Sequence, residues 1–360
     1  MFDAIAAHLH RLVASGAALN AGVARIADGA EEAAVFGAVT PGGEAARAGD
    51  RIRMASISKA ATARAFVAVA LRNGVPLDTP AGAVLDMDLP GVTLDHLLSH
   101  TSGLTDHAGY IVDPPASVAG FITAHPAAMS NAPPGTFFRY ANLNYILLGM
   151  ALEAIAGARF DRVLRAEVLD PAGVAGGFNW VGVADRRALP CFQRRGDGLD
   201  LEADGPGTDW GAELVWRGGA GVSLDGYRPA RDTTWFSPHA GLRMSVAEAA
   251  RLARFLMADD AAGREQRRVR WRFDGSNGED CDGLFTAFAA GLSHYDGHPR
   301  IPGPLVGHAG HALGFTGGAW ANTARGTAWA YFLNGTPDLT EGQDGEAFYG
   351  GDEAWIMARL

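Results

Sequence analysis

The chain is predicted to be an α/β protein of the α+β type. An antiparallel β-sheet is flanked by helices from the two chain ends, and a mainly helical lobe is inserted between its halves. Two observations support this fold class: strand-like patterns and one helix occur near each terminus, and the region between them has mostly helical spacing. With 360 residues, 48% of them hydrophobic and 19% charged, the chain can bury a core of that size.

The N-terminal region is predicted to form a helix and then a hairpin. Apolar residues recur at helical spacing over 2–17. Strand-like runs follow at 20–27 and 33–39, and Asp28-Gly29-Ala30 between them suits a hairpin turn. These two strands are expected to lie in the sheet.

Helices are predicted in the next part of the chain. Ser56 opens a helical stretch that runs from Ala60 to Asn73 and ends at Gly74, a residue type that favours helix termination. A second apolar stripe at helical spacing covers 142–156 and ends at Gly157.

The C-terminal third returns to strands after one more helix. Ser245 with Glu248 three residues later is a capping-box pattern, which predicts a helix start. The predicted elements here are a helix at 245–257, strands at 315–322 and 327–333, and a helix at 352–359.

Two stretches, 175–235 and 260–304, show little periodicity and are predicted to be irregular. The resulting division assigns 1–75 and 300–360 to the sheet domain, with roughly 236–260 packed near it, 76–235 to the helical lobe with an irregular insertion at 175–235, and 261–299 to an irregular elaboration. A cleft between the domain and the lobe would suit a small-molecule site.

Lys59 is the one lysine among the 30 Lys and Arg residues of the chain, and it follows Ser56 by three residues. Arginine does not lose its proton in a protein, whereas a buried lysine can become neutral and act as a base. At an i,i+3 offset on a helix the two side chains share one face. The S-x-x-K pattern therefore predicts a nucleophile and its base.

Two further segments carry side chains that complement this pair. Tyr140 can act as a proton relay near a cationic amine, and Asn142 can hold the lysine or a substrate carbonyl. His308 lies in a glycine-containing run with Gly310 and His311. Glycine there would let a substrate approach a strand edge, and the His311 backbone N–H would be an oxyanion donor together with the Ser56 N–H.

The same segments resemble the serine β-lactamase-like superfamily, in the branch of class C β-lactamases, DD-peptidases, D-aminopeptidases and family VIII carboxylesterases. The similarity covers about 50–170 and 240–335, in the order of the family's motifs. It rests on Arg53-Met54-Ala55-Ser56-Ile57-Ser58-Lys59, Asn73-Gly74-Val75-Pro76-Leu77-Asp78-Thr79-Pro80, Leu97-Leu98-Ser99-His100-Thr101-Ser102-Gly103-Leu104, Phe138-Arg139-Tyr140-Ala141-Asn142 and Gly307-His308-Ala309-Gly310.

The resemblance implies a role for each matching residue. Ser56 is expected to be the acyl-forming nucleophile and Lys59 its base or proton shuttle, with either Lys59 or Tyr140 as the main base. Tyr140 would assist proton transfer to the leaving group, and Asn142 would orient the lysine. His308 stands where many relatives have the lysine of K-T-G, so a charge that binds substrate is missing, as it is among esterase and amidase relatives.

Composition argues against several other functions. A formal net charge of −10 does not suit nucleic acid or an anionic membrane surface. No uncharged run reaches the ~18 residues of a membrane span, and no secretory pattern opens the chain, so the protein is expected in the cytoplasm. Cys191 and Cys281 lie far apart and are expected to be free thiols.

No metal or cofactor is predicted. His96 and His100 have helical spacing, but no carboxylate is placed to complete a site with them. Trp216, Trp235 and Phe236 either line an acyl pocket or serve as packing residues.

The function expected from these residues is a serine hydrolase that forms an acyl-enzyme on a small ester. Amide substrates, as for a D-amino acid amidase or D-aminopeptidase, are the nearer alternative, and weak β-lactamase activity is a further one. A covalent sensor without turnover, or an inactive binding homologue, is the alternative of another class. The oligomeric state is not readable from the sequence.

Overall fold

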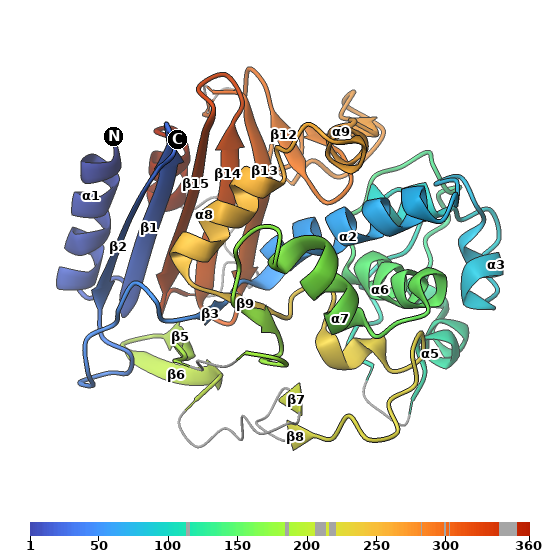
Figure 1. Ribbon diagram of the computed structural model, residues 1–360, viewed down its shortest axis with the longest axis horizontal. Helices are drawn as coiled ribbons and strands as arrows, with labels where there is room; N and C mark the ends of the chain where they lie inside the picture. Colours follow the sequence, from blue (N-terminus) through green and yellow to red (C-terminus); the bar gives the residue numbers. More distant parts are fainter. Residues whose placement is uncertain are drawn as a thin grey trace.

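An eight-stranded antiparallel sheet forms one side of the computed structural model (Figure 1). The structure describes residues 1–112, 116–183, 187–205, 214–215, 221–281, 283–298, 300–301, 303–337 and 351–360. In sheet order, the strands are β10 (Trp271–Arg272), β11 (Ala287–Phe288), β12 (Ser293–Tyr295), β13 (Leu305–Ala312), β14 (Phe315–Asn322), β15 (Thr327–Asn334), β1 (Asn20–Ala27) and β2 (Ala30–Gly37). Both ends of the chain therefore contribute to one sheet, as predicted.

The two faces of this sheet are covered by different helices. Alternate residues of β15 point to opposite faces: Trp329 and Tyr331 join one core, and Ala330 joins the other. The first core includes α1 (Phe2–Ala14) and α10 (Gly351–Met357), which come from the two chain ends. The second includes α8 (Val246–Phe255), which crosses the sheet in Figure 1.

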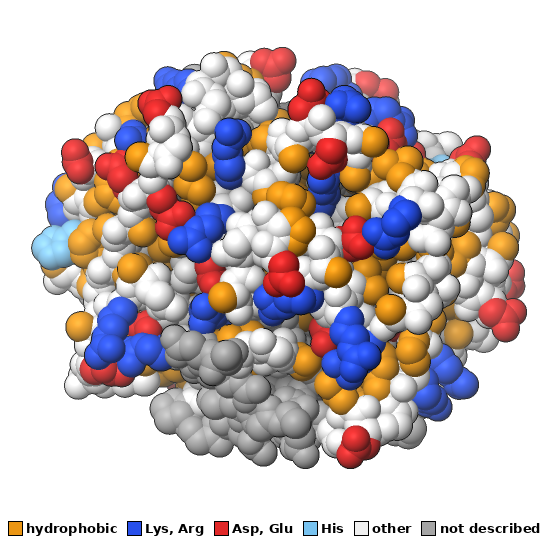
Figure 2. Space-filling view, viewed as in Figure 1, with side chains coloured by type: hydrophobic (Ala, Val, Ile, Leu, Met, Phe, Trp, Pro, Cys, Tyr) orange, Lys and Arg blue, Asp and Glu red, His pale blue; other side chains and the backbone are white. Residues whose placement is uncertain are grey.

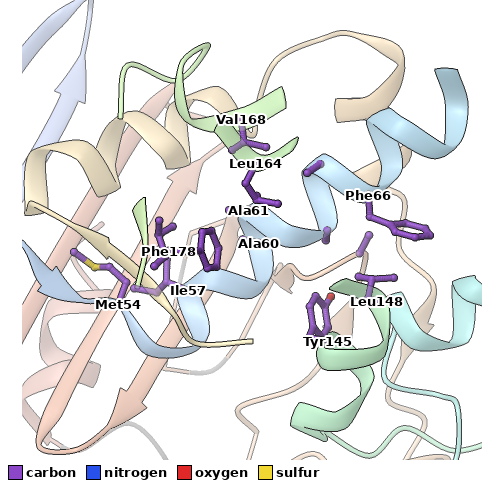
Figure 3. Packing of buried hydrophobic residues seen from close by; sticks show 14 of the residues in the cluster. Met54, Ile57, Ala60, Ala61, Phe66, Tyr145, Leu148, Leu164, Val168 and Phe178 are labelled. Carbon is purple, nitrogen blue, oxygen red and sulfur yellow. The ribbon is translucent and has the colours of Figure 1, made fainter. Parts of the chain in front are cut away.

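Helix α2 (Ser58–Arg72) connects the sheet to the helical part of the molecule. Its alanine-rich surface allows neighbouring helices to approach closely, and it packs against α6 (Asn142–Ala156), α9 (Ala261–Arg267) and η3 (Arg165–Leu169). Figure 3 shows Leu164 and Val168 next to Ala61 and shows Tyr145 and Leu148 on the α6 side. The other helices of this part are α3 (Ala81–Leu85), α4 (Leu94–Leu98), α5 (Val118–Ala124), η2 (Pro126–Ala128), α7 (Phe160–Leu164) and η4 (Thr233–Phe236).

A second sheet of three strands includes β3 (Ile52–Arg53), which precedes η1 (Ala55–Ile57) and α2 in the chain. It consists of β3, β9 (Leu242–Met244) and β4 (Gly177–Phe178), in the order β3-β9-β4. The buried ion pair between Arg51 and Glu248 (3.0 Å) connects the segment before β3 to α8. This sheet fixes the chain where it turns into the segment that carries Ser56.

Most of the long predicted elements are confirmed. Helix α6 has the predicted bounds and ends at Gly157 with φ +62°, and α8 begins with the predicted capping box of Ser245 and Glu248. The β1–β2 turn has positive φ at Asp28 and Gly29, as a tight hairpin requires. The division of the chain into a domain and a lobe stays a prediction.

The prediction of irregular structure was wrong for parts of two stretches. Residues 260–304 contain α9 and strands β10, β11 and β12, which extend the main sheet. Residues 175–235 contain β4, η4, the hairpin of β5 (Cys191–Arg195) and β6 (Gly198–Ala203), and the pair β7 (Leu214–Val215) and β8 (Gly221–Val222). Most of these strands have only two or three residues, too few to show a period of two.

Cys191 is a buried free thiol and Cys281 an exposed one, as predicted. Within the described ranges, no single helix has both the length and the apolar content to cross a membrane; one pair, Asn142–Ala156 with Phe160–Leu169, passes that test together but is bent by 83°. Figure 2 shows acidic and basic side chains interspersed over one face of the molecule.

Candidate active site

Ser56 lies in a tight turn between β3 and α2. The turn is the 3-10 helix η1 (Ala55–Ile57), and the residue before the serine, Ala55, has φ +44°, in the left-handed region that alanine seldom adopts. The Met54 N–H donates to the Leu242 carbonyl (2.8 Å), so β9 holds the strained turn in place. Ser56 itself remains partly exposed, as the predicted nucleophile role requires.

Lys59 is fully buried below Ser56, with its Nζ 2.8 Å from Ser56 Oγ. The amine also donates to Asn142 Oδ1 (2.7 Å) and to the His239 carbonyl (3.2 Å). Both of these oxygens can only accept. A neutral amine has two N–H groups and one lone pair, so these contacts direct the lone pair to the Ser56 hydroxyl.

The surroundings of Lys59 favour the neutral amine. Burial lowers the pKa of Lys59 from 10.5 to about 7; the positive charge of Arg53 contributes to the lowering, and the carboxylate of Asp106 opposes it. A lysine with this pKa is substantially deprotonated at neutral pH. It can therefore accept the proton of an attacking hydroxyl.

Asp106 is a site residue that the sequence analysis missed. Its Oδ2 accepts from the Asn142 backbone N–H (2.7 Å) and from Asn142 Nδ2 (2.9 Å), and its Oδ1 accepts from the Leu143 N–H (3.2 Å). These contacts hold the first turn of α6 and direct Asn142 Oδ1 toward Lys59. The signal in the sequence was an acidic residue two positions after the Leu97–Leu104 motif, but no pattern pointed from it to Asn142.

Tyr140 and His308 lie together beside the serine. Tyr140 Oη is 3.4 Å from His308 Nε2 and lies within range of the Ser56 side chain, and the Lys59 Nζ lies 4.7 Å from the centre of the tyrosine ring. Burial raises the pKa of Tyr140 well above its usual range, so the phenol keeps its proton.

His308 is neutral in this position. Burial and the nearby Lys59 lower its pKa to about 3. Its Nδ1 contacts the Ala309 carbonyl, which can only accept, so Nδ1 carries the proton and Nε2 is free to accept from the Tyr140 hydroxyl. His308 therefore orients Tyr140 and brings no positive charge to the site.

His100 positions the segment that carries Tyr140. Its ring lies on the Tyr140 ring, with 4.3 Å between their centres, and its Nδ1 accepts from the Ala141 N–H (3.2 Å) and from Asn144 Nδ2 (3.1 Å). Burial lowers the pKa of His100 well below its usual range. The histidine of the Leu97–Leu104 motif is thus a neutral support for Tyr140.

Strand β13 passes against the turn that carries the nucleophile. A Cβ added to Gly310 would lie 2.6 Å from the Met54 carbonyl oxygen, so this approach requires glycine. The His311 side chain points away from the serine and donates to Glu353 of α10, with 2.6 Å between Nε2 and Oε2. Only the His311 backbone can therefore serve Ser56.

The register of the β13–β14 hairpin sets the direction of that backbone. Leu313 and Gly314 form a two-residue turn, and both have positive φ, so the flanking pair Ala312 and Phe315 is the hydrogen-bonded one. Hydrogen-bonded and non-hydrogen-bonded pairs alternate along the hairpin, so the next pair, His311 and Thr316, is not hydrogen-bonded. The His311 N–H therefore points away from β14. On that other side, β12 pairs with β13 only up to Gly307.

The Ser56 N–H is the second candidate donor. Among the described residues, no hydrogen-bond acceptor is found for it. An N–H group at the nucleophile without a protein partner is the arrangement an oxyanion needs.

Two of the three aromatic residues expected near the site make contacts with other aromatic rings. Phe236 is fully buried and contacts Phe160 and Tyr227, so it is a packing residue; Trp235 contacts Tyr227. Trp216 lies outside the described residues. Within the part of the chain that the structure describes, no group of three His, Cys, Asp or Glu side chains is arranged to hold a metal ion.

Comparisons with known proteins identify the family and the fold. The model of the family named Beta-lactamase matches residues 5–349. Over 129 residues the chain is 30% identical to penicillin-binding protein 4 of Amycolatopsis lactamdurans, a match that spans 33% of this chain and 33% of that protein. The chain thus spans about one third of the length of this relative.

Two solved structures share the fold over nearly the whole chain. The D-amino acid amidase of Ochrobactrum anthropi SV3, in complex with L-phenylalanine amide, has a TM-score of 0.70 at 19% identity and covers 99% of this chain and 98% of its own. The octameric penicillin-binding protein homologue of Pyrococcus abyssi has a TM-score of 0.71 at 19% identity, covering 99% and 77%. At these identities the likeness concerns the fold alone.

Proposed function

Because the chain belongs to the Beta-lactamase family, we propose that it is a serine hydrolase that cleaves a small carboxylic ester through an acyl-enzyme on Ser56. One observation carries the proposal: the Lys59 amine lies 2.8 Å from the Ser56 hydroxyl and has a pKa lowered to about 7. A nucleophile within hydrogen-bond reach of a neutral base is the requirement for this chemistry.

The first half of the reaction forms the acyl-enzyme. Ser56 Oγ attacks the ester carbonyl carbon while its proton passes to Lys59 Nζ. The tetrahedral oxyanion is held by the N–H groups of Ser56 and His311. As the intermediate collapses, the bond to the leaving oxygen breaks, and that oxygen receives a proton from the lysine ammonium, directly or through the Tyr140 hydroxyl.

The second half removes the acyl group. Water attacks the Ser56 ester, its proton passes to the same Lys59–Tyr140 pair, and the pair returns it to Ser56 Oγ as the carboxylic acid leaves. Asn142 and the His239 carbonyl keep the amine aligned through both halves, since each holds one of its N–H groups.

Esters are proposed over amides because His308 is neutral and cannot protonate a leaving amine. An amine leaving group must be protonated before it departs, whereas an alcohol leaves more readily. With a pKa of about 3, His308 supplies no acidic proton at neutral pH. Amide hydrolysis is the second candidate, because the protonated phenol of Tyr140 lies beside Ser56 and could donate to a leaving nitrogen.

A substrate panel tests this proposal. The panel contains p-nitrophenyl esters of short acids, D- and L-amino-acid amides and nitrocefin, and kcat/KM is measured for each with wild type and Ser56→Ala. The expected result is highest kcat/KM on an ester, with no turnover by Ser56→Ala. Highest kcat/KM on an amide would favour the second candidate. A burst of one p-nitrophenol per chain without turnover would favour the covalent sensor. No release of p-nitrophenol at all would favour the inactive homologue.

The cytoplasmic location stays a prediction.

A further inference from the structure

Arg53 is a charged side chain close to Ser56 in the sequence that forms no ion pair with any described residue. It is the last residue of β3, three positions before Ser56. Its guanidinium makes no hydrogen bond or ion pair with any described residue, and it is partly exposed. A guanidinium has five donors and is always charged, so leaving it half-buried and unpaired is costly.

The small sheet explains why Arg53 has no partner among the residues that the structure describes. Arg53 lies directly opposite Arg243 in the β3–β9 pair, which places two like charges across from each other. Arg243 takes both oxygens of Asp204, at 3.0 and 3.1 Å, and also donates to the Gly241 carbonyl (2.8 Å). Both Asp204 oxygens are thereby engaged by Arg243, and among the described residues Arg53 is left without an ion pair of its own.

The charge of Arg53 acts on the groups that surround Ser56. Burial is the main cause of the lowered pKa values of Lys59 and His239, and the charge of Arg53 adds to both; burial together with Arg243 lowers the pKa of Arg53 itself. The guanidinium is therefore within electrostatic range of Lys59 and His239, and it is partly shielded from water.

Two more polar groups near Arg53 also have no partner. The Tyr110 hydroxyl, partly exposed and within electrostatic range of Arg53, makes no hydrogen bond with a described residue. The buried Nδ1 of His239 has none either, and the His239 and Tyr110 rings touch, with 5.3 Å between their centres. A cation and two neutral polar groups thus lie near one another, and the His239 carbonyl connects them to Lys59 at the candidate site.

We propose that Arg53, with Tyr110 and His239, binds a carboxylate of the substrate, so that the ester or amide cleaved at Ser56 carries a free carboxylate elsewhere in the molecule. The planar fork of arginine matches the two oxygens of a carboxylate. One uncompensated guanidinium also balances a single negative charge, which favours a carboxylate over a doubly charged phosphate. The inference rests on the proposed hydrolase function and names its substrate class.

Twin substrates that differ only in this charge test the proposal. For a carboxylate in the acyl part, the p-nitrophenyl monoester of adipic acid is compared with p-nitrophenyl methyl adipate. For a carboxylate in the leaving group, the depsipeptide hippuryl-glycolate is compared with its glycolamide twin. The expected result is a charged-to-neutral ratio of kcat/KM of about 10 to 100 for wild type in one of the two pairs, which also identifies the part that carries the carboxylate.

Matched variants assign the preference to Arg53. Arg53→Met should bring the ratio to about one or below, and Arg53→Lys, which keeps the charge but not the fork, should leave an intermediate ratio. Arg254→Met is the control, because Arg254 is exposed on α8 and makes no ion pair with a described residue. It should keep the wild-type ratio.

The outcomes separate this inference from the proposed function. If wild type hydrolyses the neutral twins without preferring either charged one, or if Arg53→Met retains the preference, the inference is overturned and the hydrolase stands. If wild type hydrolyses neither member of either pair, binding is measured by calorimetry instead. The affinities for monomethyl adipate and for N-acetyl-D-alanine are each compared with the affinity for the corresponding amide. Binding of a carboxylate about tenfold tighter than its amide, lost in Arg53→Met, supports the inference without catalysis, and equal binding overturns it.

Discussion

Two groups of polar residues around Ser56 differ in how they are satisfied. In the first group, which we call the reaction side, Lys59, Tyr140 and Asn142 all have protein partners at 2.7 to 3.4 Å. In the second group, which we call the recognition side, Arg53, Tyr110 and His239 have donors or acceptors that no described residue meets.

This difference indicates two tasks. Groups that move protons must be fixed before the substrate arrives, because geometry within a few tenths of an ångström decides the rate. Groups that bind an anion are left unsatisfied until the anion arrives, because binding energy comes from the contacts the free protein lacks. Substitutions on the reaction side should therefore change the rate for every substrate, and those on the recognition side should change the ranking of substrates.

The largest effect is expected for Lys59→Met, which keeps the length of the side chain and removes the amine. Without its base, acylation by Ser56 should slow by about 10³-fold for charged and neutral substrates alike. Arginine is a poorer test because Lys59 is fully buried and a guanidinium would overpack the site. The rate of p-nitrophenyl ester hydrolysis, with Ser56→Ala as the floor, checks this; a loss below tenfold would contradict it.

Tyr140→Phe should cost about 10²-fold, because it removes the hydroxyl between Ser56 and His308. The loss should be greater for an amide than for an ester with the same acyl group. Tyr145→Phe is the matched control: its hydroxyl donates to the Leu98 carbonyl at 2.9 Å, within the core. That variant should lose about 1 kcal/mol of stability and keep most of its activity. Equal rate losses in the two variants would refute a special role for Tyr140.

Asp106→Asn should lower kcat by roughly tenfold, because Asn142 would no longer be held toward Lys59. It should also destabilise the start of α6 by about 1 kcal/mol. Ser245→Ala removes the cap of α8 and should cost about as much stability without a change in kcat. Thermal melting and kcat for both variants separate the two effects; an unchanged kcat in Asp106→Asn would mean that Asp106 serves the helix alone.

The smallest effect is a change in pH dependence. Because the base must be neutral, kcat/KM should rise with pH through an apparent pKa near 7 and level off above it. Arg53 helps to lower the pKa of Lys59, so Arg53→Met should raise that pKa and move the rise to higher pH, by less than about one pH unit.

The neighbours of Lys59 allow this rise to be assigned. The charged and titratable groups that act on Lys59, or on which it acts, are Arg53, Asp106, His100, His239 and His308. The pKa values of the three histidines are all lowered, so they are neutral throughout the rise. A profile that does not move in Arg53→Met would contradict the electrostatic effect of Arg53 on Lys59.

The sequence predicted the reaction side better than the recognition side. Ser56 and Lys59 share a helix start, and Tyr140 and Asn142 share a turn, so short spacings reveal each pair. Asp106 and His239 reach Lys59 through long-range contacts, which leave no periodic trace in one sequence. Arg53 stood inside a matching motif, but its lack of a partner depends on the β3–β9 register and on Asp204, which only the folded chain shows.

The same reason explains which parts of the fold could be predicted. The hairpin of β1 and β2 and the helix α6 are long enough for a repeat to show. Strands β10, β11 and β12 have two or three residues and are held by neighbours in the sheet, so their pairing outweighs any local pattern.

The central claim is that Lys59 activates Ser56 for covalent attack. Incubation with a fluorophosphonate, followed by intact mass and peptide mapping, tests it most directly. The account predicts one adduct per wild-type chain, on Ser56, formed faster as the pH rises through about 7, with no adduct on Ser56→Ala and very slow labelling of Lys59→Met. An unlabelled wild-type chain, an adduct on another residue, or undiminished labelling of Lys59→Met would contradict it.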